Sequence, residues 1–199
     1  MATVVAVDDG YDAIVLAGGA GRRMGGVDKP ALRVGDATLL DRALAAVPAA
    51  ARVVVVGPPR PTSRAVTFCL EDPPGGGPAA ALAAGVPLTA AEVVVVLAAD
   101  LPRVAPAVPL LLAAVPASGV AVLRDADGRD NYLAAAWRRR SLVTALASVT
   151  VPSGMSMRAL FAGVPVVAVA DEDGWARDCD TWDDLASARD ELARVREES

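Results

Sequence analysis

The sequence contains no histidine and only two cysteines, Cys69 and Cys179, which stand far apart. This composition excludes zinc sites built from clustered Cys and His, catalytic triads that depend on histidine, and a histidine general base. Any metal must therefore be held by oxygen ligands, which favours magnesium, manganese or calcium. Two isolated cysteines are also typical of a protein in the reducing cytoplasm.

Aromatic residues are scarce, at 4% of the 199 residues, and the formal net charge is −5. Few rings are left on which the bases of single-stranded nucleic acid could stack. An acidic chain is also a poor general ligand for nucleic acid or for an anionic membrane surface. The long apolar stretches near 79–99 and 107–123 are interrupted by proline, glycine or acidic residues, and the chain does not open with a basic targeting segment. We therefore expect a cytoplasmic protein that binds neither nucleic acid nor membrane.

Apolar residues make up 54% of the sequence, enough for a substantial core. Several of them form continuous β-branched runs without polar alternation, a pattern typical of strands that are covered on both faces. The clearest predicted strands are 12–17, 52–57 and 93–99, and weaker candidates are 65–70, 119–123 and 164–170.

Predicted helices occupy 38–47, 77–85 and 181–198. The first and the last open with Thr-x-x-Asp, the spacing of a capping box, and the second lies between a proline and a glycine. Strands that alternate with helices predict an α/β fold: a three-layer α/β/α sandwich around a mostly parallel, Rossmann-like sheet. No repeat or linker divides the chain, so we predict a single domain over 1–199.

Polar or glycine-rich segments follow four of the predicted strands, at 18–30, 71–78, Asp100 and 170–180. Ligands of open α/β sheets bind at the carboxyl ends of the strands. These four segments therefore predict a single site on one edge of the sheet. Glu71 has no predicted role there and is expected to be solvated.

The first of these segments belongs to the string LAGGAGRRMGGVDKP, residues 16–30. Its glycines let backbone N–H groups turn toward a ligand, and such concave loops bind phosphate. Arg22 can fork onto phosphate oxygens, and Lys29 adds a point charge. The string is neither a Walker A loop nor a GxGxxG motif, which removes a dinucleotide-dependent oxidoreductase from consideration. A surface turn with solvated charges is the alternative.

Asp100 ends a buried apolar strand in the string VLAADLP. A buried carboxylate is costly unless it has a partner. A divalent cation is the usual partner in sites of phosphoryl transfer, whereas a helix cap or a salt bridge is the alternative.

The combination of LAGG, RRMG and DKP resembles the signature loop of nucleotidyltransferases that attach NMP to a phosphorylated acceptor. From residue 11 to about 190, the chain is similar to the molybdenum cofactor guanylyltransferase family. The resemblance implies an NTP-binding half at about 11–102 and an acceptor-binding half at about 103–199. It also implies Mg²⁺, with Mn²⁺ as the alternative, bound at Asp100.

The resemblance further implies roles for individual residues. The implied catalytic residues are Lys29, Arg22 and Asp100. The implied nucleotide-binding residues are Leu16, Ala17, Gly18, Gly19, Gly21, Lys29, Asp72 and Gly77. The implied acceptor-binding residues are Arg129, Asn131, Asp178 and Asp180.

Some of these positions differ from the family pattern. Asp178 and Asp180 stand where the family commonly carries asparagine, and Asn131-Tyr132 stands where relatives often have His-Pro. Asp180 has an alternative role as a cap of the last helix. The segment 127–139 is expected to precede the acceptor-side strand, and 154–161 is expected to form a helix near the acceptor.

The reaction that the resemblance implies is the transfer of GMP from GTP to molybdopterin or its molybdenum-loaded form, with release of pyrophosphate. LAGG is typical of the GTP-using branch, whereas the CTP-using relatives more often read LAAG. A phosphate nucleophile needs no general base, which agrees with a chain without histidine. The alternatives are a cytidylyl- or other nucleotidyltransferase of the same fold, and a non-catalytic accessory protein that binds the cofactor. Transient contacts with molybdoenzymes or their chaperones are also implied.

Overall fold

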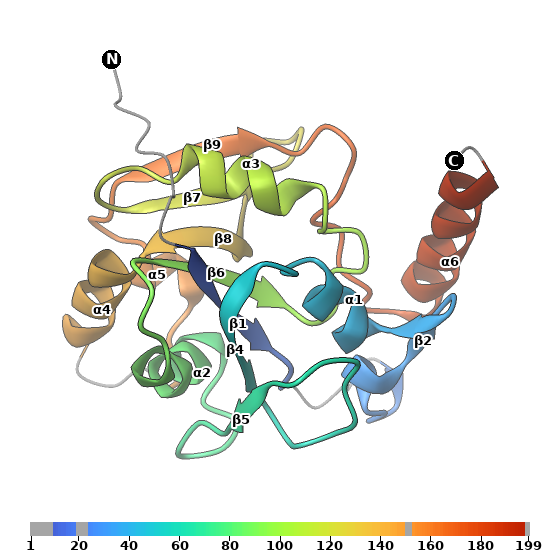
Figure 1. Ribbon diagram of the computed structural model, residues 1–199, viewed down its shortest axis with the longest axis horizontal. Helices are drawn as coiled ribbons and strands as arrows, with labels where there is room; N and C mark the ends of the chain where they lie inside the picture. The colour runs from blue at the N-terminus through green and yellow to red at the C-terminus, as the bar shows by residue number, and fades with distance from the viewer. Residues whose placement is uncertain (1–9, 19–23, 150–152, 198–199) are drawn as a thin grey trace.

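The computed structural model describes residues 10–18, 24–149 and 153–197 (Figure 1). Gly19, Gly21 and Arg22 lie outside the described residues, so the roles predicted for them stay predictions.

Seven strands form one mixed sheet in the order β5-β4-β1-β6-β8-β7-β9. They are β1 (Tyr11–Leu16), β4 (Ala50–Val56), β5 (Thr67–Cys69), β6 (Val93–Ala98), β7 (Val120–Arg124), β8 (Asp130–Arg138) and β9 (Val166–Ala170). All neighbouring strands are parallel except β8, which is antiparallel to both β6 and β7. The predicted strands and the mostly parallel sheet are thus confirmed.

Strand β8 corrects one expectation. Residues 127–139 were expected to precede the acceptor-side strand, but Asp130–Arg138 is itself that strand. Its sequence, DNYLAAAWR, is rich in alanine and has no β-branched residue, so its local preference for a strand is weak. Hydrogen bonding to β6 on one side and β7 on the other makes it a strand.

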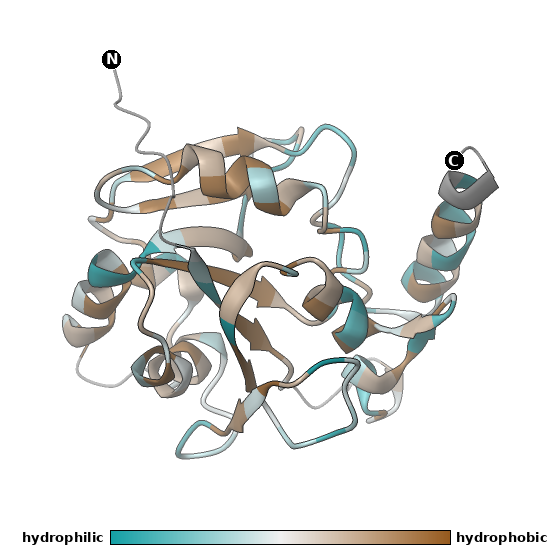
Figure 2. Cartoon of the chain, viewed as in Figure 1, coloured by the Kyte–Doolittle hydropathy of each residue, from teal (hydrophilic) through white to brown (hydrophobic). Residues whose placement is uncertain are grey.

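Helices cover both faces of this sheet and confirm the three-layer sandwich (Figure 1). One face packs against α1 (Leu39–Ala45) and α3 (Ala107–Ala114), and the other against α2 (Pro78–Gly85), α4 (Arg139–Ala147) and α5 (Met157–Leu160). The inner strands carry continuous apolar residues because both of their faces are buried (Figure 2). No helix among the described residues is long and apolar enough to cross a membrane.

A third, smaller core lies beside the sheet. Helix α6 (Trp182–Glu197) packs there against the hairpin of β2 (Arg33–Val34) and β3 (Ala37–Thr38). Short 3₁₀ helices, η2 (Lys29–Ala31) and η3 (Val86–Leu88), complete the described elements. Leu185 and Cys179 are buried in this core, so α6 fixes the position of the segment that leads into it.

Both capping boxes are present. The Thr38 hydroxyl accepts a hydrogen bond from Asp41 N at 3.0 Å, and the Thr181 hydroxyl accepts one from Asp184 N at 3.1 Å. The Asp184 carboxylate in turn accepts from Thr181 N at 2.8 Å. The side chain that caps α6 together with Thr181 is therefore that of Asp184, which leaves the Asp180 carboxylate for another contact.

The sheet topology creates a crevice at the carboxyl ends of β1 and β6. The chain leaves β1 toward β4 on one side and later returns to β6 on the other side, so the crossover direction reverses between these strands. Leu16 and Asp100 lie at this point, where ligands of doubly wound sheets bind.

Gly57 allows the end of β4 to approach the loop after β1 closely. Its φ is +152°, and a Cβ atom there would lie 2.6 Å from the carbonyl oxygen of Ala17. The Ala17 N–H donates to Val56 O at 2.8 Å, so the two backbones are held together at this point.

We expect Gly57→Ala to lower the melting temperature, because it combines a strained φ, worth about 1–3 kcal/mol, with a clash against a backbone carbonyl that cannot swing aside. Gly128→Ala is the matched control, since its φ of +79° is also positive but no atom lies within 4 Å of the added Cβ. Thermal unfolding followed by circular dichroism measures both variants. Equal losses in the two variants would contradict the close approach.

Candidate functional site

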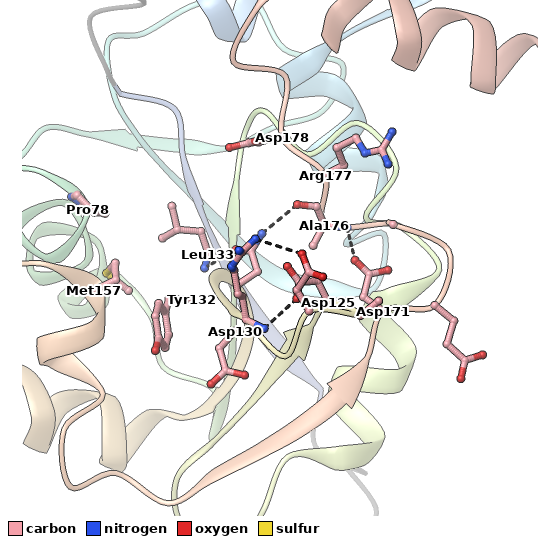
Figure 3. A pocket seen from close by; sticks show the side chains of 16 residues that line it. Pro78, Asp125, Asp130, Tyr132, Leu133, Met157, Asp171, Ala176, Arg177 and Asp178 are labelled. Atoms are coloured by element: carbon pink, nitrogen blue, oxygen red, sulfur yellow. Dashed lines mark hydrogen bonds and ion pairs between the residues drawn. The ribbon is translucent and has the colours of Figure 1, made fainter.

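Two adjoining cavities lie along the carboxyl edge of the sheet and share Pro78 and Leu133 in their linings. The smaller, of about 390 Å³, contains Gly18 from the loop after β1, Glu71 from the loop after β5, and Asp100 from the end of β6. The larger, of about 810 Å³, is lined by β8 and the segments 125–129 and 171–178 (Figure 3). The polar segments that follow the predicted strands thus meet at one edge, as the sequence predicted.

Lys29 lies where these segments converge. Its ammonium group donates to Asp100 Oδ2 at 2.6 Å and to Asp180 Oδ1 at 2.6 Å, and its side chain is 14% exposed. Burial opposes the charged form of Lys29, but the contacts with the two carboxylates outweigh it and raise the pKa of the ammonium group. The salt bridge considered for Asp100 in the sequence is therefore present, and its partner is the lysine of the DKP string.

A third carboxylate, that of Asp178, lies in the same region. Burial, followed by the nearby carboxylates of Asp180 and Asp100, raises the pKa of Asp178, although Lys29 acts in the opposite direction. Lys29 contacts two of these carboxylates, Asp100 and Asp180. Carboxylate oxygens are the metal ligands that Mg²⁺ and Mn²⁺ prefer.

The residues around Asp100 fit a divalent cation that takes only some of its ligands from the protein and the others from water or substrate. Among the described residues, no three His, Cys, Asp or Glu side chains are grouped to hold a metal by themselves. Mg²⁺ is commonly held by one or two carboxylates together with water and substrate phosphates. Asp100 and Asp180 can supply such carboxylate oxygens.

The segment 171–180 is held over the site by backbone hydrogen bonds. The buried Asp171 carboxylate accepts from Trp175 N at 2.7 Å and from Ala176 N at 2.9 Å. Further on, Cys179 N donates to the carbonyl oxygen of Asp100 at 3.1 Å. These contacts place Asp178 in the larger cavity and Asp180 against Lys29.

Asn131 joins β8 to the same segment. Its side-chain nitrogen donates to Ala176 O at 3.0 Å, and its side-chain oxygen accepts from Leu133 N at 2.9 Å. Asn131 therefore lines the larger cavity, but both ends of its amide also hold the protein backbone.

An irregularity in β8 turns side chains toward the cavities. Val122 of β7 pairs with Ala135, whereas the next residue, Leu123, pairs with Asn131, so 132–134 bulge out of the β7–β8 ladder. Bulges re-aim side chains in this way at functional sites. Tyr132 and Leu133 line the larger cavity as a result.

Most of the predicted site residues that the structure describes line one of the two cavities or take part in the Lys29 contacts, and two do not. The smaller cavity is lined by Leu16, Gly18, Gly77 and Asp100, and the larger by Arg129, Asn131 and Asp178. Lys29 and Asp180 contact each other beside Asp100. Ala17 and Asp72 line neither of these two cavities. Glu71, which was expected to be solvated, lines the smaller one.

Glu71 and Arg60 are the residues that sequence reasoning missed. The Glu71 carboxylate accepts from Gly75 N at 3.1 Å, so the segment 71–75 curves around this carboxylate. The Arg60 guanidinium donates to Ala17 O at 3.1 Å and to Asp28 Oδ1 at 2.8 Å. Arg60 thus connects the residue that follows β1 to the residue that precedes Lys29. No motif around Arg60 signals this role, because its partners lie more than thirty residues away in the chain.

The two cysteines differ in burial. Cys179 is 1% exposed, and burial together with the Asp100 carboxylate raises the pKa of its thiol to about 12. Cys69 is half-buried.

We expect one thiol to react with Ellman's reagent at pH 8 in the folded protein, because only about one in ten thousand Cys179 thiols is ionised at that pH.

The second thiol should react only after denaturant is added. Cys69→Ser should abolish the native reaction, while Cys179→Ala should leave it intact. Titration of two thiols in the folded wild-type protein would contradict the buried position of Cys179.

The strand order and the lysine–aspartate contact at the carboxyl edge of the sheet define a doubly wound α/β protein with a ligand crevice at that edge. Comparison with known proteins is more specific. Residues 13–170 match the family model of the MobA-like NTP transferase domain. The chain therefore belongs to this family of nucleotidyltransferases.

One curated relative agrees with this assignment, and solved structures share the fold. A molybdenum cofactor guanylyltransferase from Acidiphilium cryptum is 36% identical over 133 residues, which cover 63% of this chain and 65% of that protein, slightly under two thirds of its length. A nucleotidyl transferase from Methanothermobacter has the same fold, with a TM-score of 0.76 and 20% identity over 94% of this chain and 99% of that one. A 2-C-methyl-D-erythritol 4-phosphate cytidylyltransferase from Thermus thermophilus gives a TM-score of 0.68 and 23% identity over 92% and 99%.

Proposed function

We propose that this protein transfers GMP from GTP to the phosphate of molybdopterin or its molybdenum-loaded form and releases pyrophosphate. The observation that carries the proposal is the position of Lys29 and Asp100 at the edge where two cavities adjoin. Such an arrangement suits a reaction that joins two bound molecules, since positioning lowers the barrier by removing translational and rotational freedom in advance. The guanylyltransferase from Acidiphilium supports the choice of substrates.

The smaller cavity is the proposed nucleotide site. Gly18 and Gly77 give it walls without side chains, and Pro78 starts α2 beside it, so the positive end of that helix favours a phosphate or a polar base edge. The Glu71 carboxylate lines the same cavity; one of its oxygens accepts from Gly75 N, and the other is available as an acceptor. Guanine presents a ring N–H next to an exocyclic amino group, whereas cytosine presents an amino group and no ring N–H. A carboxylate can therefore distinguish the two bases, which makes Glu71 a candidate for base selection.

The larger cavity is the proposed acceptor site. Asp125 and Asp171 lie on one side of it, and Tyr132 and Met157 on the other (Figure 3). Carboxylates accept hydrogen bonds from the ring N–H groups of a pterin, and the apolar side chains can cover its faces. Arg129, which also lines the cavity, is the proposed contact for the acceptor phosphate.

In the proposed reaction, an oxygen of the acceptor phosphate attacks the α-phosphorus of GTP in line. A new P–O bond forms, the bond to the bridging oxygen breaks, and its electron pair leaves with pyrophosphate. Lys29 neutralises phosphate charge as it develops, which is the main requirement of this chemistry. Mg²⁺, held by Asp100 with Asp180, would supply further charge neutralisation of the phosphate oxygens.

We expect GTP with Mg²⁺ to raise the melting temperature, because a ligand at a hundred times its Kd adds about 2.7 kcal/mol to stability. ATP, CTP and UTP are the comparison ligands. Lys29→Ala should remove the shift. Each variant is compared with its own melting temperature in buffer, since Lys29→Ala also removes the contacts of the ammonium group with Asp100 and Asp180. Arg158→Ala, at an exposed position in α5, is the control that should retain it.

The alternatives give different results in the same experiment. A shift with CTP alone would identify a cytidylyltransferase, a chemistry known for the structural relative from Thermus. The absence of a shift with all four nucleotides would favour the accessory protein that binds the cofactor without catalysis. The cytoplasmic location and the contacts with molybdoenzymes or chaperones stay predictions.

Asp100→Asn should lower the rate of pyrophosphate release by about 10²–10³-fold, the range seen when one group that stabilises developing charge is removed. The rate is measured against Mg²⁺ concentration with GTP and molybdopterin. Asp190→Asn, an exposed change in α6, should leave the curve unchanged. An Asp100→Asn enzyme with the same rate and the same Mg²⁺ dependence as the wild type would overturn the role of Asp100.

A further inference from the structure

Three consecutive arginines line a separate cavity at the opposite edge of the sheet. This arginine cavity, of about 360 Å³, is lined by Ala90, Ala91, Glu92, Ala117, Arg138, Arg139 and Arg140. Arg138 pairs with Val93 at the first residue of β6, whereas Asp100 follows the other end of that strand. The length of the strand separates the two sites by roughly 20 Å.

Neutral oxygens of the protein hold the three guanidinium groups in place. Arg138 Nε donates to Pro116 O at 2.9 Å, Arg139 Nε to Thr89 Oγ1 at 3.1 Å, and Arg140 Nη2 to Ala117 O at 2.6 Å. These bonds orient the groups without neutralising their charge. Most of their N–H groups have no hydrogen-bond partner among the described residues, and a guanidinium that is already oriented loses less entropy when it binds an anion.

Carboxylates do little to balance this charge. Glu92 is the one acidic residue among the described residues of the lining; it lies 3.5 Å from Arg138 Nη1, and its side chain is 79% exposed. The Asp12 carboxylate contacts the neighbouring segment, but it is 1% exposed and accepts from Arg52 N, Ala90 N and Ala91 N. Counted over the described residues that line it, the cavity thus has a net positive charge in a protein whose net charge is −5.

The position of the arginines in the fold adds to the imbalance. Arg139 and Arg140 are the first two residues of α4, at the positive end of the helix dipole. Basic side chains are unfavourable at this end, because the helix dipole is positive there. A bound anion would remove this cost and would meet several guanidinium N–H groups at once.

We propose that the arginine cavity binds a phosphate or pyrophosphate group, and that this site is separate from the proposed nucleotide site. The planar fork of arginine matches the oxygens of these anions, and the volume of the cavity accommodates a group of this size. Its ligand is a free anion or the phosphate end of a small metabolite.

The test measures the melting temperature of the full-length protein with millimolar phosphate or pyrophosphate and without Mg²⁺. Lys29→Ala is the background, because it disables the proposed nucleotide site. Arg139→Gln/Arg140→Gln in this background removes two charges from the arginine cavity, and Arg194→Gln, an exposed arginine of α6, is the matched control. Arg138 is left unchanged because it is buried.

We expect at least one of the two anions to stabilise the background protein and its Arg194→Gln variant. The Arg139→Gln/Arg140→Gln protein should bind that anion at least tenfold more weakly and, in buffer alone, should melt no lower than the background protein, since repulsion is relieved. A response to one anion identifies whether the ligand carries a single phosphate or a pyrophosphate. An equal shift of the melting temperature in the Arg139→Gln/Arg140→Gln protein would overturn the proposal, and so would the absence of a shift in the background protein with either anion. Neither result bears on GTP binding by the wild type.

Discussion

The contact of one lysine ammonium with two carboxylates holds the candidate site together. Lys29 comes from the segment after β1, Asp100 from the end of β6, and Asp180 from the segment before α6, so the bonds join positions 71 and 151 residues apart. Because the lysine is mostly buried, each bond is screened less than a surface ion pair would be. The contact thereby fixes the edge at which the two cavities meet.

The surrounding structure explains why these charges can be gathered there. The direction of the crossovers reverses between β1 and β6, which opens a crevice at their carboxyl ends. Asp171 and Asn131 hold the segment 171–180 by its backbone, and the small core around Leu185 anchors its far end. Carboxylates that would repel one another on a free chain are kept close by these contacts to the backbone.

Much of the fold could be predicted, because its signals are local. Continuous runs of valine indicated β4 and β6, and Thr-x-x-Asp indicated where α1 and α6 begin. Strand β8 could not be predicted in this way, since its alanines have little preference for a strand and its neighbours decide its state. In the site, Asp100 and Lys29 stood out by sequence, but Arg60 and the inward position of Glu71 did not.

The sequence by itself determined the alternation of strands and helices, the absence of histidine chemistry, and the oxygen-rich, glycine-rich character of the site. These properties follow from residue type and short-range spacing. Only the tertiary structure decided that Asp180 binds Lys29 while Asp184 caps α6, that Asn131 holds a backbone carbonyl, and that three arginines surround a cavity at the far edge. Pairings of this kind depend on which distant segments the sheet brings together. The sequence around a carboxylate does not indicate which cation it will contact in the folded protein.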